Sequence, residues 1–472
     1  MRMAFTEVAA ACGPHQSHGD VHPGNETSMK DVLLITWHGI HELDIFPGLP
    51  DTGGQNIYVQ NMAQQIHDLC HCRVTILNRG GYVHPYTERM REGMTKDPDR
   101  ELYVLHVGDD IAAFVRKEYL TGALIENAVD PILHQLPQGY QPSLIISNFW
   151  DGGLLGDHLC KHFPDALHVW VPHEPVGMKK APLTHEEQER HSIFIRERYE
   201  ERVLDNAHLI GSTSKLVQQD LSLAHGRDWT EKLIDIYPGV DTERFRPMER
   251  HELTGQQARG YAEFTGLPAE LFKRPHICEF GRSDSLKDKD KAVEAFALVA
   301  KHEPDINMFL NLDENMEPGV ARRIHNVIER DALHDRIHVF SPRDLPQNGA
   351  GANILPNIMR TARAFLTMSV MEGFGMAACE AAACGIPVVG TEHIPVVTDV
   401  VAPGGGGTVV PGKDIHAAAD AVLKYIRMND AEWQQVAQNA HDSVIPRYTW
   451  KQIVNEMLDQ FRAKGYDLQL SA

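Results

Sequence analysis

The chain has 472 residues, 42% of them hydrophobic, which is enough for two or three domains with packed cores. Its 65 acidic residues outnumber its 45 Lys and Arg residues, so the formal net charge is −20. This charge argues against nucleic acid or an anionic membrane as the main partner, because either would require a basic face.

The cysteines and the apolar runs indicate the cellular compartment of the protein. Seven cysteines are scattered singly, apart from the Cys70-His71-Cys72 triplet, which has no second ligand pair at metal-site spacing. This pattern predicts free thiols in a reducing compartment rather than a disulfide framework. No apolar run approaches the ~20 residues of a membrane span, and the N-terminal stretch does not have the form of a signal peptide. We therefore expect a cytoplasmic protein.

The N-terminal half reads as the start of a doubly wound sheet. Residues 1–29 are predicted to be a disordered leader, so that the folded sequence begins near Asp31. An apolar strand over 32–39 ends in glycine, a Gly-rich loop follows, and a helix over 57–69 precedes a strand over 73–78. Further strands are expected at 144–148, 169–172 and 209–214, the last of them closing the first unit.

A polar connection over 250–273 leads to a second set of strands. These strands are predicted at 276–281, 306–312, 336–340 and 362–369. The first of them is followed by Arg282 and Lys287, two cations placed to face whatever binds at the strand's carboxyl end.

The stretch from Met371 to Val389 carries the clearest functional signal. Glu372 precedes a Gly-Phe-Gly turn, and an alanine-rich helix is predicted from Met376 to Cys384. The first amides of a helix are free and partly positive, so they can bind a diphosphate. Glu380, one turn into the helix, could accept hydrogen bonds from a ribose, while Glu372 lies nearer the group that the diphosphate carries. This order suits a nucleotide-sugar, although a buried helix with a solvated acid at each end is the competing interpretation.

Three motifs resemble one family of enzymes. The string E-G-F-G-M-(x)4-E-A-(x)2-C-G-I-P-V-V, beginning at Glu372, resembles the signature of retaining GT-B glycosyltransferases of glycosyltransferase family 4. The loop P-D-T-G-G-Q-(x)2-Y-V, beginning at Pro50, is similar to that of the sucrose synthase and sucrose-phosphate synthase branch. The segment from Gly281 to Lys287 resembles that family's G-R-x-D-x-x-K motif.

The resemblance implies an α/β fold of two Rossmann-like units that face each other across a cleft. It places an acceptor unit at 30–245, a nucleotide-sugar donor unit at 246–445, and a C-terminal helix within 446–472 that crosses back to the first unit. The donor residues that it implies are Gly53, Gly54, Arg282, Lys287, Glu372, Gly373, Phe374, Gly375, Met376 and Glu380. Of these, Arg282, Lys287 and Glu372 are also expected to be catalytic, together with His173.

The same resemblance suggests an acceptor site in the first unit. The segments F-V-R-K-E at 114–118, N-F-W-D-G-G at 148–153 and H-E-P-V-G-M-K-K at 173–180 are similar to segments of the sucrose-phosphate synthase branch. Glu174 and Pro175 replace the Ser and Leu of that branch. The acceptor residues that it implies are Gln55, Arg116, Lys117, Asp151, Lys180 and Arg196.

The activity implied is transfer of a hexosyl group, in the first place glucosyl, from a nucleoside diphosphate sugar to a sugar or sugar-phosphate acceptor, with retention at the anomeric carbon. The leaving phosphate could take the acceptor's proton, so no separate base is expected. No cofactor is expected to be required, and a divalent cation such as Mg²⁺ would only stimulate. Two alternatives remain open: a retaining phosphorylase or trehalose-type synthase on the same fold, and a nonenzymatic sugar- or nucleotide-binding module.

Overall fold

The computed structural model describes residues 29–45, 51–85, 87–181, 183–248, 262–263, 265–341 and 354–470. The predicted leader, apart from its last residue, and about half of the predicted connection over 250–273 lie outside these ranges. Among the described residues, no helix combines the length and the apolarity that a membrane crossing needs.

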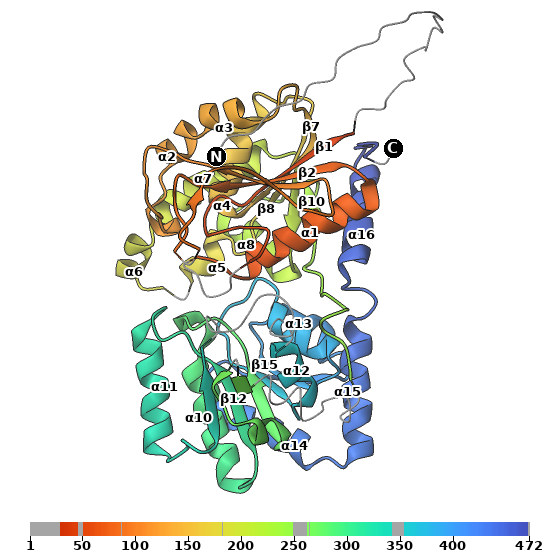
Figure 1. Cartoon of the computed structure of the whole chain (residues 1–472). Coiled ribbons are helices and arrows are strands. Elements are labelled where there is room, and N and C mark those ends of the chain that lie inside the picture. Colours follow the sequence, from red (N-terminus) through yellow and green to blue (C-terminus); the bar gives the residue numbers. More distant parts are fainter. Residues whose placement is uncertain are drawn as a thin grey trace, which may run out of the picture.

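The first unit is built on an eight-stranded sheet with the order β10-β9-β8-β7-β1-β2-β6-β5 (Figure 1). Neighbouring strands are parallel except for β5 and β6. The last strand, β10, pairs with β9. The strands are β1 (Asp31–Ile35), β2 (Arg73–Arg79), β5 (Gly93–Lys96), β6 (Leu102–Val107), β7 (Pro142–Asn148), β8 (Leu167–Val171), β9 (Leu209–Ser212) and β10 (Leu233–Asp235).

Helices cover both faces of this sheet, so its central strands are continuously apolar rather than alternating. All five residues of β1 are buried, for example. A short hairpin of β3 (Tyr82–Val83) and β4 (Met90–Arg91) is appended to the unit. The helices are α1 (Gly54–Cys70), α2 (Gly122–Asn127), α3 (Val129–Gln135), α4 (Phe149–Cys160), α5 (Val176–Lys180), α6 (His185–Arg190), α7 (Ile193–Asn206) and α8 (Lys215–His225).

The second unit contains a six-stranded sheet in which every neighbouring pair is parallel, with the order β13-β12-β11-β14-β15-β16. Its strands are β11 (His276–Glu279), β12 (Asn307–Asn311), β13 (Ile337–Phe340), β14 (Phe365–Thr367), β15 (Val388–Thr391) and β16 (Gly407–Val410). Its helices are α10 (Lys289–His302), α11 (Pro318–Arg330), α12 (Ile354–Thr361), α13 (Met376–Ala383) and α14 (Ile415–Arg427).

The end of the chain returns to the first unit. Helix α15 (Asp430–Val444) lies along the second unit, and α16 (Trp450–Ala463) lies beside α1 and β10 (Figure 1). The Gln460 side chain accepts a hydrogen bond from the Asp235 amide at 2.7 Å, and the Val240 amide donates to the Tyr448 carbonyl at 2.7 Å. The two units are therefore connected by packing as well as by the chain.

The strand orders fix where a ligand can bind. In the first sheet the order reverses between β1 and β7, and in the second sheet it reverses between β11 and β14. In an open parallel sheet, ligands bind outside the carboxyl ends of the strands at such a switch point. The loops after these four strands are therefore the places where the two half-sites should lie.

Candidate active site

A cleft of about 1710 Å³, including its open mouth, lies between the two units and is lined by both. Its walls come from the loops at both switch points, as the topology requires. Every donor residue that the sequence predicted lines this cleft, and so does the predicted catalytic residue His173. Of the six predicted acceptor residues, only Gln55 and Lys117 line it.

The paired glycines of the first unit meet the second unit across the cleft. Helix α1 begins at Gly54, three residues earlier than the sequence predicted, so these glycines form the helix N-terminus itself. A Cβ atom added to Gly53 would lie 3.4 Å from Cδ of Arg282, and one added to Gly54 would lie 3.4 Å from Sδ of Met376. Met376 is the first residue of α13. The N-termini of two helices, each with free amides, therefore border the same space.

Two cations stand beside these helix ends. Lys287 Nζ lies 2.6 Å from Oε1 of Glu372, and an Arg282 nitrogen lies 3.1 Å from Oδ2 of Asp284. Burial lowers the pKa of Lys287, but the carboxylates around it, Glu372 first, outweigh burial and leave the pKa raised. The pKa of Arg282 is also raised, mainly by Asp284. Both side chains are therefore positively charged at neutral pH.

Glu372 is held in place by two donors. Ser369 donates a hydrogen bond to its Oε1 at 2.9 Å, and Lys287 contacts the same oxygen. Both Ser369 and Glu372 follow β14, on the far side of the switch point from Arg282 and Lys287. The carboxylate therefore has a fixed position in the cleft.

The Gly-Phe-Gly turn allows two close approaches. A Cβ atom on Gly373 would lie 2.3 Å from the carbonyl oxygen of His173 in the other unit. Gly375 has a φ of +104°, and a Cβ atom there would lie 2.5 Å from Ile394. The carbonyl of Phe374 accepts a hydrogen bond from the Val396 amide at 2.9 Å. The segment that contains Ile394 and Val396 thus supports the turn.

His173 lies two residues after the end of β8 and has a left-handed backbone, with φ of 58°. Its Nε2 lies 2.9 Å from Oδ1 of Asn148, whose amide nitrogen donates to the Ile35 carbonyl. Burial lowers the pKa of His173 to about 3, so the imidazole is neutral. Because Asn148 presents an oxygen, Nε2 carries the proton and donates it, which leaves Nδ1 unprotonated.

Glu380 lines the donor end of the cleft, on the first turns of α13. Burial raises its pKa to about 7, while the nearby Arg244 lowers it. A carboxyl group with this pKa changes its charge near neutral pH, which makes its ligand contacts sensitive to pH.

The end of the cleft where Gln55 and Lys117 lie is rich in ion pairs. Lys117 Nζ contacts Asp51 and lies 3.0 Å from Oε1 of Glu118. Asp51 also accepts a hydrogen bond from the Lys117 amide at 3.0 Å. The aspartate of the P-D-T-G-G-Q loop therefore positions this lysine. Gln55 donates to the Thr36 hydroxyl at 3.0 Å.

Three predicted acceptor cations do not line the cleft. Arg116 is 58% exposed and pairs with Glu118, and Lys180 is 38% exposed and pairs with Glu197. Arg196 is buried, stacked over the Trp150 ring, and its nearest paired carboxylate oxygen is 3.9 Å away. Its Nε and one terminal nitrogen have no hydrogen-bond partner among the described residues. These arginine and lysine positions correct the prediction that all four cations surround the acceptor directly.

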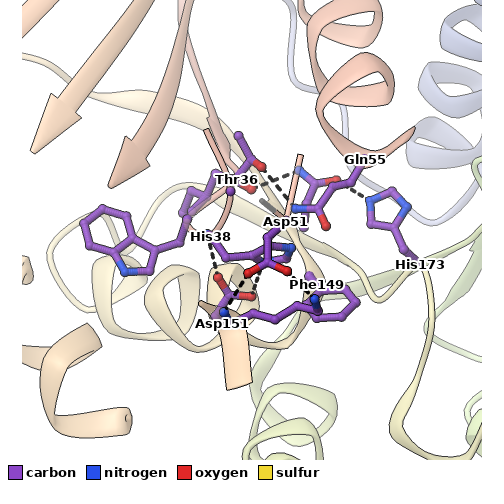
Figure 2. Close-up of polar contacts among 12 residues, drawn as sticks. Thr36, His38, Asp51, Gln55, Phe149, Asp151 and His173 are labelled. Carbon is purple, nitrogen blue, oxygen red and sulfur yellow. Dashed lines mark hydrogen bonds and ion pairs between the residues drawn. The ribbon is translucent and has the colours of Figure 1, made fainter. Parts of the chain in front are cut away.

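Asp151 is also placed differently from the prediction. Its side chain is completely buried, and its two oxygens hold His38: Oδ1 lies 2.8 Å from Nδ1 of the imidazole, and Oδ2 accepts from the His38 amide at 2.8 Å (Figure 2). His38 lines the cleft, whereas Asp151 does not. Asp151 therefore contacts His38 and does not itself face the cleft.

Several lining residues were not predicted, among them a second carboxylate beside His173. Glu174 Oε2 lies 2.8 Å from Nζ of Lys179, which is itself 5.0 Å from the centre of the Phe149 ring. Lys179, Arg282 and Lys287 together outweigh burial and lower the pKa of Glu174. Its position next to His173, after a buried strand, was the signal available in the sequence. The cleft is also lined by four further residues with ionisable side chains that were not predicted as site residues: His38, Asp51, Glu174 and Lys179.

Comparisons with known proteins agree with this geometry. Residues 270–442 match the family model described as "Glycosyl transferases group 1". Mannosylfructose-phosphate synthase of Agrobacterium fabrum is 27% identical over 374 residues, covering 77% of this chain and 76% of that protein. D-inositol 3-phosphate glycosyltransferase of Paenarthrobacter aurescens is 27% identical over 383 residues, covering 80% and 85%.

Solved structures share the fold. Sucrose-phosphate synthase from Thermosynechococcus elongatus superimposes with a TM-score of 0.72 at 22% identity, covering 92% of this chain and 98% of that one. HepE from Anabaena, solved in complex with UDP-glucose, gives a TM-score of 0.65 at 16% identity, covering 92% and 99%. The predicted GT-B architecture is thus confirmed, and the match over residues 270–442 together with the relatives supports a sugar-transferring enzyme.

Proposed function

We propose that this enzyme transfers a hexosyl group, in the first place glucosyl, from a nucleoside diphosphate sugar to a sugar or sugar-phosphate acceptor with retention of the anomeric configuration. One observation carries the proposal: Arg282, Lys287, the N-terminus of α13 and the Gly53-Gly54 turn border a single space, with Glu372 and His173 beside it. HepE, which has the same fold, was solved in complex with UDP-glucose, and this supports UDP-glucose as the first donor to test.

The proposed diphosphate site combines three kinds of positive group. Arg282 and Lys287 supply full charges, and the first amides of α13 supply hydrogen-bond donors with partial positive charge. When the bond between the sugar and the phosphate breaks, negative charge grows on the departing oxygen. Groups that are already in position stabilise that charge without reorganisation, which is the main source of catalysis that we assign to them.

On the sugar side, Glu372 and His173 flank the reacting carbon in our proposal. The Glu372 carboxylate would accept hydrogen bonds from sugar hydroxyls and offset positive charge on the ring. The neutral His173 imidazole keeps an unprotonated Nδ1, which can accept a hydroxyl proton in a hydrogen bond. The acceptor oxygen attacks from the face that the phosphate leaves, and the leaving oxygen takes its proton.

We further propose that a phosphorylated acceptor, such as fructose 6-phosphate or a similar polyol phosphate, uses Lys117 at the acceptor end of the cleft. Lys117 lines the cleft, and Arg196 adds a buried positive charge whose unpartnered donors could turn toward an anion. Two relatives are named for phosphorylated sugars or polyols, which supports this choice of substrate.

A matrix of donors against acceptors tests the proposal. UDP-, ADP- and GDP-hexoses are each combined with sugars and with their phosphates, and release of the nucleoside diphosphate is measured. We expect turnover only with a nucleotide donor, an α-anomeric product, and a loss of turnover when the acceptor phosphate is removed. Turnover that requires inorganic phosphate instead of a nucleotide would favour a phosphorylase, and an absence of turnover with tight nucleotide binding would favour a binding module.

Glu380 should make donor binding depend on pH. In the proposed role its carboxylate accepts hydrogen bonds from the ribose hydroxyls, so the charged form is the competent one, and burial raises its pKa to about 7. The affinity for UDP-glucose should therefore be highest above pH 7. It should fall as the pH decreases below 7, by up to about tenfold per pH unit. Calorimetric titration with UDP-glucose measures this effect, because its esterified phosphates do not titrate in this range.

The matched variant is Glu380→Gln, which cannot change its charge. Its affinity for UDP-glucose should be lower than that of the wild type at pH 8 and nearly constant between pH 5.5 and 8. A variant that keeps the pH dependence of the wild type would show that another group is responsible.

A further inference from the structure

The pair formed by His38 and Asp151 lies at the switch point of the acceptor unit. His38 follows β1, and Asp151 lies in the first turn of α4, directly after β7. These are the two strands between which the order of the first sheet reverses. Ligands of open parallel sheets bind outside the carboxyl ends of such strands. His38 therefore occupies the position in the first unit that corresponds to the cations of the second unit.

The contacts of the pair show which ring nitrogen faces the carboxylate. Asp151 accepts from the backbone amide of His38 through Oδ2 and faces the imidazole Nδ1 through Oδ1, both at 2.8 Å. A buried carboxylate is an acceptor only, so Nδ1 must carry a proton and donate it. In the neutral imidazole, Nε2 then has a free lone pair. No hydrogen-bond partner for Nε2 occurs among the described residues, and His38 lines the cleft.

Backbone strain surrounds the same point. Asp51, Phe149 and His173 all line the cleft, and all three have a left-handed backbone, with φ of 52°, 64° and 58°. The Phe149 ring packs edge-on against His38 at 4.7 Å between centres. Non-glycine residues rarely adopt this conformation, and where they do the surrounding structure must enforce it, most often at functional sites. Figure 2 shows Asp51, Phe149, His38 and His173 gathered at this end of the cleft.

We propose that His38 binds a hydroxyl group of the acceptor, accepting its hydrogen bond at Nε2, and that Asp151 is a positioning residue that holds the imidazole in the required tautomer. The inference rests on the proposed function, because it assigns the acceptor side of the same cleft. In this proposal His38 contributes to the binding and orientation of the acceptor and does not contact the donor. The acceptor's proton still passes to the leaving phosphate oxygen.

The contacts of Asp151 allow an exact test through Asp151→Asn. The His38 amide requires an oxygen from residue 151, so the new side chain would present its oxygen to the backbone and its NH₂ group to the imidazole. Nδ1 would then have to accept, and the proton would move to Nε2. The imidazole would stay in place but offer a donor where the acceptor hydroxyl needs a lone pair.

The experiment measures the KM for the acceptor, the affinity for UDP-glucose, and the slow hydrolysis of UDP-glucose without acceptor. For His38→Ala and Asp151→Asn we expect an increase of about tenfold or more in the acceptor KM, since each removes a hydrogen bond to the substrate. Donor affinity and hydrolysis should change less than about twofold. An acceptor KM unchanged in both variants would overturn the proposal.

Asp157→Asn is the matched control. Asp157 lies on the same helix and is also buried, but its oxygens bind Arg202 at 2.6 Å and Asn206 at 2.7 Å, away from the cleft. This variant should keep the wild-type acceptor KM even if its melting temperature falls. An equal rise of the acceptor KM in this control would also overturn the proposal, because the effect would then be structural.

A measurement on the wild type remains decisive if a variant fails to fold. With ¹⁵N-labelled histidine, the chemical shifts of His38 report which ring nitrogen carries the proton. We expect Nδ1–H in the free enzyme and a shift of the Nε2 signal on addition of the acceptor. A proton on Nε2, or a signal that the acceptor does not move, would contradict the inference. If the wild type binds no nucleotide-sugar at all, the proposed function fails instead.

Discussion

Replacing Lys287 by Met should lower kcat/KM by about 10²–10³-fold, because the leaving diphosphate loses one full positive charge that a largely buried side chain supplies. Lys287 lines the cleft, and its Nζ is 2.6 Å from Glu372 Oε1. The loss should appear mainly in kcat, since negative charge on the phosphate grows as the sugar departs. Nucleotide release from UDP-glucose in the presence of the best acceptor measures it.

Two further variants separate catalysis from structure. Lys291→Met removes a half-exposed lysine of α10 that pairs with Glu294, and it should leave kcat/KM within about twofold of the wild type. Lys287→Met also leaves the Glu372 carboxylate without its cation, so Glu372→Gln alone and in combination with Lys287→Met shows how much of the loss comes from that uncompensated charge. If Lys287→Met retained wild-type activity, the diphosphate would have to bind elsewhere.

Gly373→Ala should lower kcat by on the order of 10²-fold or more by forcing the two units apart at the reaction centre. The added Cβ would lie 2.3 Å from the carbonyl oxygen of His173 and 3.3 Å from its carbonyl carbon, and both of these are backbone atoms. Neither side can rotate away, so Glu372 and His173 must separate by roughly 1 Å, a displacement that costs about 10²-fold in well-oriented reactions. Steady-state kinetics measures the effect on kcat.

Gly319→Ala is the matched control, because a Cβ there would meet no heavy atom closer than 3.9 Å, in the flexible Arg323 side chain. It should leave kcat unchanged and leave the melting temperature equal or slightly higher, as expected for alanine in a helix. Full activity in Gly373→Ala would mean that the approach of the two units at His173 is not needed for turnover.

The donor half of the site could be predicted from the sequence because its parts are local. The Gly-Phe-Gly turn, the start of α13 and Glu380 lie within nine residues, and their mutual placement follows from helix geometry. Arg282 and Lys287 follow directly after a buried strand, which fixes the edge of the sheet where they appear.

The acceptor half could be predicted only in part, because it depends on contacts between distant segments. Asp151 and His38 are separated by 113 residues, and nothing in the sequence near either of them shows that their side chains will form a hydrogen bond. Arg116 and Lys180 pair with Glu118 and Glu197, and a sequence dense in both charges does not show which of the possible pairs will form.

A crystal structure of the enzyme with a bound nucleoside diphosphate tests the central claim most directly. The account predicts that the diphosphate oxygens lie within hydrogen-bond distance of Arg282, Lys287 and the first amides of α13, with the ribose hydroxyls on Glu380. A diphosphate bound away from Arg282 and Lys287, or a nucleotide whose ribose does not contact Glu380, would contradict it.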